Sequence, residues 1–191
     1  MEKHAKIQSA APSRAVRTLY EWLEEIVIAL TLVILILTFV FRVVTVSGMS
    51  MQPNYHNGDR LIVATHGYTL EQGSVVVMTN VLDEPIIKRV IAMEGQTVNI
   101  DYSTGIVTVD GVAVDEREFG LQNGITTSPS SAYEPLVFPQ TVPQNCVFVL
   151  GDNRGVSQDS RYATIGMVDE RHILGEAVLI LYPFDRFGLI E

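Results

Sequence analysis

The apolar positions of the chain fall into two patterns, one continuous and one interrupted. Residues 26–41 read IVIALTLVILILTFVF without a charge, and the apolar character continues beyond Arg42 to Val46. A helix over residues 26–46 would be about 30 Å long, which matches the hydrocarbon core of a bilayer. We therefore predict one N-terminal transmembrane helix there. A buried helix of a soluble protein is the alternative, although charge-free runs of this length favour a span.

A cleavable targeting signal is a second alternative for this segment. Such a signal has an apolar region of about 7 to 15 residues close to the N-terminus and a small-x-small cleavage site after it. Here the run is longer, roughly 25 residues precede it, and no Ala-x-Ala follows. The pattern predicts a retained anchor.

Beyond the anchor, short runs rich in Val and Ile alternate with Gly, Asn or Asp. No stretch has convincing helical periodicity, so we predict a mainly β domain over residues 47–191. The dipeptide Asp110-Gly111 between two such runs predicts a hairpin with a type I′ turn. The predicted strands are residues 60–65, 74–79, 86–93, 97–100, 106–109, 146–150 and 176–182.

Residues 115–145 interrupt this rhythm. They contain TTSPSSAYEPLVFPQTVPQN, which is rich in Ser and Thr and has four prolines. Long segments of this kind are functional lids, small inserted subdomains or disordered. We expect a small insert on a single β domain.

The distribution of charge predicts the orientation of the anchor. Lys and Arg near a span favour the cytoplasmic side, whereas acidic residues count for little. Residues 1–25 should therefore be cytoplasmic, and residues 47–191 extracytoplasmic. The basic residues before the apolar run are Lys3, Lys6, Arg14 and Arg17.

The composition of the predicted external part excludes several partners. Residues 43–191 hold 8 Lys and Arg against 18 Asp and Glu, and this acidic balance argues against nucleic acid. Cys146 is the single cysteine, so no internal disulfide can form, and its apolar neighbours indicate a small core residue. The four histidines show no metal-binding spacing, so we expect neither a metal nor a cofactor.

Lys88 and Arg89 lie inside the apolar run IIKRVIAM. A strand that is apolar on both faces would place at least one of these cations in the interior. Burial can lower the pKa of a lysine by about 3 to 5 units, which turns its amine into a usable general base. The alternative is a cation at a strand edge whose ammonium group reaches water.

A lysine base requires a nucleophile, and Ser50 in SGMSMQP is a candidate. Ser-Lys pairs perform the same reaction as Ser-His-Asp triads, so the absence of a suitable histidine is no obstacle. A third polar cluster, GDNRGVSQDSRY at residues 151–162, is the remaining candidate for site residues.

Four segments together resemble the sequence boxes of bacterial type I signal peptidases. They are SGMSMQP at 47–53, GDRLIV at 58–63, KRV at 88–90 and GDNRGVSQDSR at 151–161, in that order and behind an N-terminal span. The resemblance extends from the anchor through Tyr182. It implies a membrane-anchored serine endopeptidase with a β-rich catalytic domain. That enzyme would remove signal peptides from exported preproteins by a Ser-Lys dyad and an acyl-enzyme intermediate.

The resemblance also assigns roles to individual residues. Ser50 matches the nucleophile, Lys88 the general base, and Ser157 a serine that hydrogen-bonds the lysine amine. A charged cluster behind the site matches Arg89, Asp159 and Arg161, and the positive charge of Arg89 should further disfavour protonation of Lys88. Asp152, Asn153 and Arg154 match a turn beside it that we interpret as structural.

Substrate-binding residues follow from the family's mode of binding. The substrate should lie as a strand beside the segments that lead into Ser50 and Lys88, with Val44, Val46 and Ile87 shaping shallow apolar pockets. Small substrate residues would be preferred at the first and third positions before the cut.

Two positions depart from the family pattern. Gly48 replaces a serine that helps to hold the oxyanion in some members, so backbone N–H groups, including that of Ser50, should perform this role. Asn54 replaces a threonine, and we expect this change to affect a turn and not the reaction.

Two other functions remain open from the sequence. A repressor-type, self-cleaving Ser-Lys peptidase would use the same chemistry, but the chain has an anchor and no evident DNA-binding segment. A catalytically silent, membrane-anchored β module would not need both Ser50 and Lys88.

Overall fold

The computed structural model describes residues 14–130 and 134–190, except for the side chain of residue 36. Lys3 and Lys6 of the predicted cytoplasmic segment lie outside the described residues. The chain divides into two compact units, residues 1–39 and residues 40–191.

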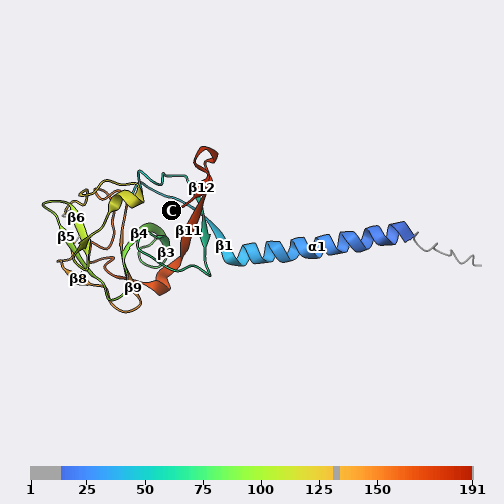
Figure 1. The fold of residues 1–191 in the computed structure, drawn as a ribbon, viewed down its shortest axis with the longest axis horizontal. Helices are drawn as coiled ribbons and strands as arrows, with labels where there is room; N and C mark the ends of the chain where they lie inside the picture. Colours follow the sequence, from blue (N-terminus) through green and yellow to red (C-terminus); the bar gives the residue numbers. More distant parts are fainter. Residues whose placement is uncertain (1–13, 131–133, 191) are drawn as a thin grey trace, which may run out of the picture. The chain divides into compact units, whose positions relative to one another are not determined.

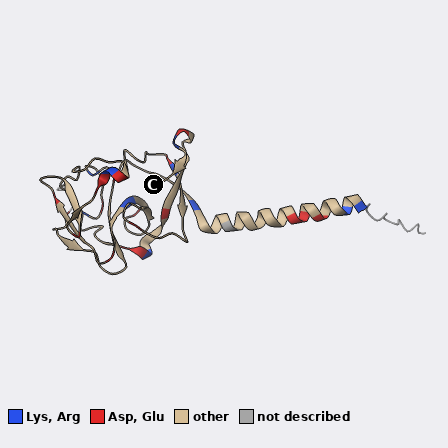
Figure 2. Cartoon of the chain, viewed as in Figure 1, with Lys and Arg blue, Asp and Glu red and all other residues tan. Residues whose placement is uncertain are grey.

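The first unit contains the helix α1, Arg14–Val40. Among the described residues it is the one helix long and apolar enough to cross a membrane. Its charged residues gather in its N-terminal part (Figure 2), and the rest is apolar on all sides. The hydroxyls of Thr31 and Thr38 donate to the carbonyl oxygens of Val27 and Ile34, four residues earlier. These hydroxyls therefore need no other partner in an apolar surrounding.

The apolar run does not stay helical to its end. The helix ends at Val40, whereas the sequence indicated a span through Val46, and Phe41–Thr45 form strand β1, paired antiparallel with β2. The VVTV sequence explains the difference because β-branched residues favour strands and β2 offers a partner. A continuous apolar run cannot by itself mark where helix gives way to strand.

The second unit is built from two antiparallel sheets (Figure 1). The larger has the order β1-β2-β11-β3-β4-β9-β10, with β12 added to β11. Its strands after β1 are β2 (Arg60–Ala64), β3 (Val75–Met78), β4 (Ile86–Ala92), β9 (Cys146–Leu150), β10 (Val168–Asp169), β11 (Ile173–Tyr182) and β12 (Gly188–Leu189). Register shifts interrupt the pairing of β4 with β9 and of β11 with β2 and β3, as β-bulges do.

The smaller sheet has the order β7-β6-β5-β8. Its strands are β5 (Thr97–Asp101), β6 (Ile106–Val109), β7 (Val112–Ala113) and β8 (Gln140–Thr141). Three short 3-10 helices complete the described part of this unit, namely η1 (Glu116–Phe119), η2 (Glu170–His172) and η3 (Phe184–Arg186). The prediction of a mainly β domain after one N-terminal apolar helix is confirmed.

All seven predicted strands are present, each with ends within a few residues of those expected. The predicted hairpin joins β6 to β7 through Asp110 and Gly111, whose φ angles of 53° and 79° are those of a type I′ turn. Within the segment 115–145, the described residues form η1, irregular chain and β8, which pairs with β5. This segment therefore contributes an edge strand to the smaller sheet.

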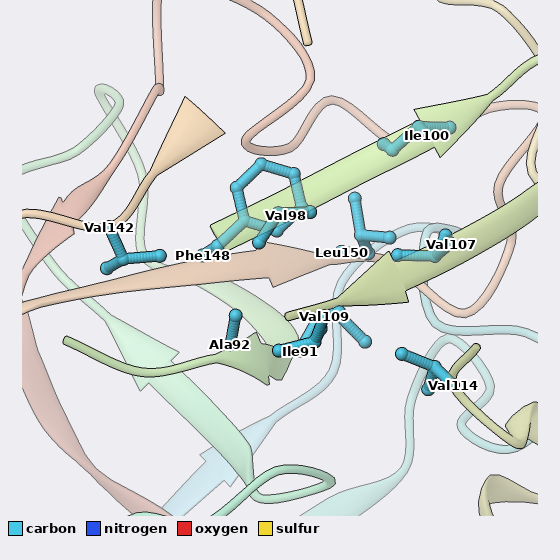
Figure 3. Close-up of a cluster of buried hydrophobic side chains, with 10 residues drawn as sticks. All are labelled: Ile91, Ala92, Val98, Ile100, Val107, Val109, Val114, Val142, Phe148 and Leu150. Atoms are coloured by element: carbon cyan, nitrogen blue, oxygen red, sulfur yellow. The ribbon is translucent and has the colours of Figure 1, made fainter. Parts of the chain in front are cut away.

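One hydrophobic cluster joins the two sheets (Figure 3). Ile91 and Ala92 of β4 and Phe148 and Leu150 of β9 pack with residues of the smaller sheet, which are Val98, Ile100, Val107 and Val109. A second cluster lies inside the larger sheet and includes Val46, Met51 and Ile87. β4 thus has apolar neighbours on both faces, which buries every side chain it carries after Ile86.

Candidate functional site

Ser50 lies in the loop that follows β1. Val46 holds the start of this loop, since its N–H donates to the Asp59 carbonyl and its own carbonyl accepts from the Gly58 N–H. Gly48 has a φ of +85°, a left-handed conformation that glycine adopts without strain, and its N–H donates to Asn57 Oδ1. Met51, next to Ser50, is buried in the second cluster. The loop thus fixes a half-buried serine between an exposed turn and the core.

Lys88 lies in the middle of β4, between β3 and β9, and is 2% exposed. Its Nζ lies 2.9 Å from Ser50 Oγ and donates to the Ile87 carbonyl oxygen at 2.9 Å. The structure thus brings together the two residues that the sequence proposed as nucleophile and base, although 38 positions separate them.

Burial lowers the pKa of Lys88 from 10.5 to about 8, and the negative charges of Asp159 and Asp152 oppose this shift. At pH 7 an amine with this pKa is neutral in about one molecule in ten. The expected further lowering by Arg89 is not among the causes. Asp152, which binds the Arg89 guanidinium, instead raises the pKa of Lys88.

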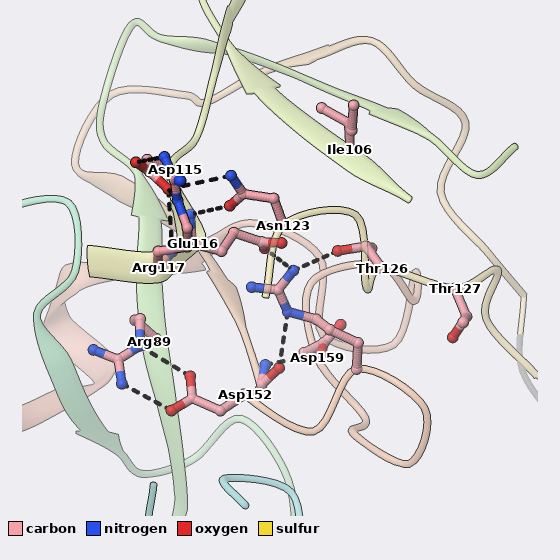
Figure 4. A network of polar contacts seen from close by, with 12 residues as sticks. Arg89, Ile106, Asp115, Glu116, Arg117, Asn123, Thr126, Thr127, Asp152 and Asp159 are labelled. Carbon is pink, nitrogen blue, oxygen red and sulfur yellow. Dashed lines mark hydrogen bonds and ion pairs between the residues drawn. The ribbon is translucent and has the colours of Figure 1, made fainter. Parts of the chain in front are cut away.

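Arg89 and Asp152 form a buried bidentate ion pair (Figure 4). Its two contacts measure 2.9 and 2.8 Å, and Arg89 Nη1 also donates to the Gly73 carbonyl. Asn54 Nδ2 donates to Asp152 Oδ2 and to the Phe119 carbonyl, both at 2.7 Å. Asn54, which we expected only to alter a turn, therefore links the loop of Ser50 to the partner of Arg89.

Asp159 and Arg161 form a second buried pair, separate from the first. Arg161 Nε and Nη2 donate to the Asp159 carboxylate at 2.8 and 2.9 Å. Asp159 Oδ2 also accepts from the Gly151 N–H. The predicted charged cluster thus exists as two ion pairs, and Arg89 binds Asp152 and not Asp159.

Ser157 packs against the nucleophile loop through Gly151. A Cβ atom on Gly151 would lie 2.1 Å from Ser157 Oγ and 2.5 Å from the Ser50 carbonyl oxygen, so only glycine fits between them. Ser157 Oγ is buried and has no hydrogen-bond partner within residues 14–130 and 134–190. The predicted hydrogen bond from Ser157 to the Lys88 amine is therefore not formed in this structure.

A third buried ion pair joins Arg154 to Glu116, and Arg154 also donates to Thr126. Glu116 and Thr126 are seen together in Figure 4. Sequence reasoning missed Glu116, whose segment was expected to form only an insert. The charged run DEREF around it was the available signal. This pair ties residues 115–126 to the turn that carries Asp152.

Ser50 and Lys88 line a cavity of about 310 Å³. Val44, Val46 and Ile87, the three predicted substrate-binding residues, line the same cavity as Ser50 and Lys88. A larger cavity of about 460 Å³ is lined by Gln52, Pro53 and Asn153 among others, but by neither Ser50 nor Lys88. The chemistry therefore favours the smaller one as the candidate active site. Within the described parts of the chain, no group of His, Cys, Asp and Glu could hold a metal ion.

A serine hydroxyl beside a buried amine is an arrangement that serine hydrolases with a lysine base use. The family model described as signal peptidase, peptidase S26, matches residues 19–182. The chain belongs to this family of serine endopeptidases.

Curated relatives agree with this assignment. Signal peptidase I of Bacillus licheniformis is 32% identical over 88% of this chain and 91% of its own length. Signal peptidase IB of Staphylococcus aureus is 31% identical over 90% of this chain and 93% of its own length. Signal peptidase I S of Bacillus subtilis is 33% identical over 89% of this chain and 92% of its own length. A crystal structure of a signal peptidase I from Enterococcus faecalis V583 aligns with a TM-score of 0.44 and 24% identity, and covers 57% of this chain and 97% of its own.

Proposed function

We propose that this protein removes N-terminal signal peptides from exported preproteins by a Ser50-Lys88 dyad while α1 anchors it in the cell membrane. The observation that carries the proposal is the 2.9 Å distance between Ser50 Oγ and the buried Lys88 Nζ. A lysine pKa of about 8 supports it, because the neutral amine is the form that can accept a proton.

The reaction begins when Ser50 Oγ attacks the scissile carbonyl carbon and the hydroxyl proton passes to the Lys88 amine. The tetrahedral intermediate then expels the new N-terminal amine, which takes the proton from Lys88, and an ester to Ser50 remains. Water, deprotonated by the again neutral Lys88, hydrolyses this ester. Lys88 returns this proton to the departing Ser50 Oγ, which releases the signal peptide and regenerates the serine hydroxyl and the neutral amine.

Backbone N–H groups are the proposed donors to the oxyanion. The Ser50 N–H has no acceptor within the described residues and is free for this role. Asn153 N–H donates to the Ser50 carbonyl at 3.0 Å, which fixes the peptide plane of the nucleophile. From the match to the family we propose that Ser157 orients Lys88. The Ser157 hydroxyl has no partner within the described residues that would compete with this role.

Substrate binds as an additional strand along the cavity. Among the described strands, β1 pairs with β2 alone, so its other edge can accept a peptide. Val44 and Val46 on the segment that begins with β1, and Ile87 on β4, give the cavity apolar walls. Small substrate residues at the first and third positions before the cut fit such shallow surfaces.

The anchor places the reaction near the membrane. Ten residues separate Val40 at the end of α1 from Ser50, at most about 35 Å of extended chain. A signal peptide's own apolar segment also lies in the bilayer, so enzyme and scissile bond would meet within its plane. We place the N-terminus in the cytoplasm, because Arg14 and Arg17 precede the apolar part of a single-pass helix.

Cleavage of a preprotein by the purified, detergent-solubilised protein tests the proposal. Ser50→Ala and Lys88→Ala should leave the precursor uncut. Ser47→Ala is the matched control because Ser47 lines the same cavity. This variant should cut within a few-fold of the wild type. An acylating inhibitor should add its mass to the wild type but not to Ser50→Ala.

Two results would contradict the proposal. Full cleavage by a folded Ser50→Ala or Lys88→Ala variant would exclude the dyad. Processing of the chain itself, without cleavage of any preprotein, would favour the self-cleaving alternative.

A further inference from the structure

The cavity around Ser50 and Lys88 has one acidic residue in its lining, Glu84. Apart from Lys88, every other residue that the structure places in this lining is uncharged. Glu84 is exposed, lies two residues before β4, and makes no hydrogen bond or ion pair within the described part of the chain. An unpaired carboxylate on a wall whose other residues, apart from Lys88, are uncharged is available to a charged substrate group.

We propose that Glu84 is a specificity-determining residue that favours a Lys or Arg side chain at the fourth or fifth substrate residue before the cut. The inference rests on the proposed function, because it takes the residues before the cut to lie along Val44, Val46 and Ile87.

The position follows from the length of the chain segment. Four residues separate Glu84 from Lys88, which is at most about 13 Å at 3.3 Å per residue. A substrate strand alongside has the same rise, so the residue opposite Glu84 is about four positions from the bond that Ser50 attacks. Because a small residue is expected at the third position, the fourth and fifth are the nearest that can carry a long cationic side chain.

Glu84 acts on the substrate and not on the base. The charges that shift the pKa of Lys88 are those of Asp159 and Asp152, and Glu84 is not among them. Replacing Glu84 should therefore change which substrates bind without moving the pH dependence of the reaction. An exposed ion pair changes affinity by about 1.5-fold to fivefold.

Three matched peptide substrates test this inference on the full-length protein in detergent. They are identical except for Lys, Gln or Glu at the fourth and fifth positions before the cut. For the wild type, kcat/KM should fall about threefold from Lys to Gln and again from Gln to Glu, mainly through KM. Glu84→Gln should remove this order, and Glu84→Lys should reverse it. Salt at 1 M should weaken the wild-type preference, because the Debye length is then only about 3 Å.

Asp83→Asn is the matched control. Asp83 is the exposed acidic neighbour of Glu84 but does not line the cavity, so this variant should keep the wild-type order. The Gln substrate serves as the measure of folding, and each variant should cut it within twofold of the wild type with the same pH profile.

The outcomes separate the two hypotheses. If the wild type cuts all three substrates equally, or if Glu84→Gln keeps the order, the inference about Glu84 is overturned while the proposed function stands. If the wild type cuts none of them, the proposed function itself fails, and the inference with it.

Discussion

Lys88 and Arg89 are neighbours on one strand and both are 2% exposed, yet their surroundings shift their pKa values in opposite directions. Arg89 receives a bidentate carboxylate from Asp152. Burial lowers the pKa of Arg89, but the hydrogen bond and charge of Asp152 raise it more, so the pKa lies above its usual value. Lys88 receives only a hydroxyl and a carbonyl oxygen, and burial brings its pKa down to about 8.

The two residues point to opposite faces of β4, and the difference suggests a structural role for Arg89 and a chemical role for Lys88. On one face a compensated charge stabilises the packing, because each donor of the ion pair meets an acceptor. On the other face the Lys88 amine has no bound carboxylate and lies next to Ser50 Oγ. The burial that costs folding free energy lowers its pKa, so that part of the amine is neutral near pH 7. This contrast leads to four measurable outcomes.

Lys88→Met removes the uncompensated amine and should have the largest effect. Cleavage should fall at least 10³-fold, on the order of the contribution of a general base together with a dyad nucleophile. The free energy of unfolding at pH 7 should rise by up to about 3 kcal/mol, because a pKa shift from 10.5 to about 8 costs that much. Cleavage assays and denaturant unfolding of the solubilised protein measure the two effects.

The size of this stability effect depends on pH. Between pH 8 and 10.5 the unfolded chain binds the lysine proton and the folded chain does not, so wild-type stability rises with pH across this range. The advantage of Lys88→Met should therefore be full below pH 8 and absent above pH 10.5. A variant less stable than the wild type at pH 7 would contradict this account.

Asp152→Asn removes the negative charge that compensates the buried Arg89 guanidinium. Loss of one partner of a buried ion pair costs about 3 to 5 kcal/mol, which unfolding experiments can measure directly. The control is Asp169→Asn, whose partner Arg171 is largely exposed, and this change should cost less than about 1 kcal/mol. Equal losses of stability in the two variants would mean that burial does not increase the contribution of the Arg89–Asp152 pair.

How far the sequence alone predicts this contrast depends on the sequence separation of the partners. Lys88 stood out because a cation inside IIKRVIAM must be buried if the segment is a strand, and the matching boxes then indicated Ser50. The partners of Arg89 could not be assigned in this way, because Asp152 lies 63 positions away and several acidic residues compete for it. The link from Asn54 to Asp152 and the pair of Glu116 with Arg154 also depend on tertiary folding.

The fold shows the same limit. Isolated Val- and Ile-rich runs predicted the strands well, because turn residues mark their ends. The end of α1 at Val40 was not predictable, since the apolar run continues past Arg42 to Val46, and Phe41–Thr45 become a strand only through pairing with β2. The edge strand β8 lies in a Pro-rich segment whose local sequence gives no strand signal.

The pH dependence of cleavage tests the uncharged state of Lys88 directly. Because the amine must be neutral to act, kcat/KM should rise about tenfold per pH unit below 8 and level off above it. Asp159 raises the pKa of Lys88, so Asp159→Asn should move the inflection to lower pH. A wild-type profile that is flat between pH 6 and 9 would show that no group with a pKa of about 8 controls the reaction.

Asn54→Ala should have the smallest effect of the four. It tests whether the Arg89–Asp152 ion pair helps to position Ser50 through Asn54. The change removes the two donations from Asn54 Nδ2, to Asp152 Oδ2 and to the Phe119 carbonyl, and should cost about 1 kcal/mol of stability. Because Asn54 follows Ser50 by four residues, kcat should also fall several-fold while KM changes little. Asn99→Ala, at an exposed position of β5, is the control and should leave both unchanged. If Asn54→Ala lowers stability but leaves kcat at the wild-type value, the ion pair of Arg89 supports the fold without positioning the nucleophile.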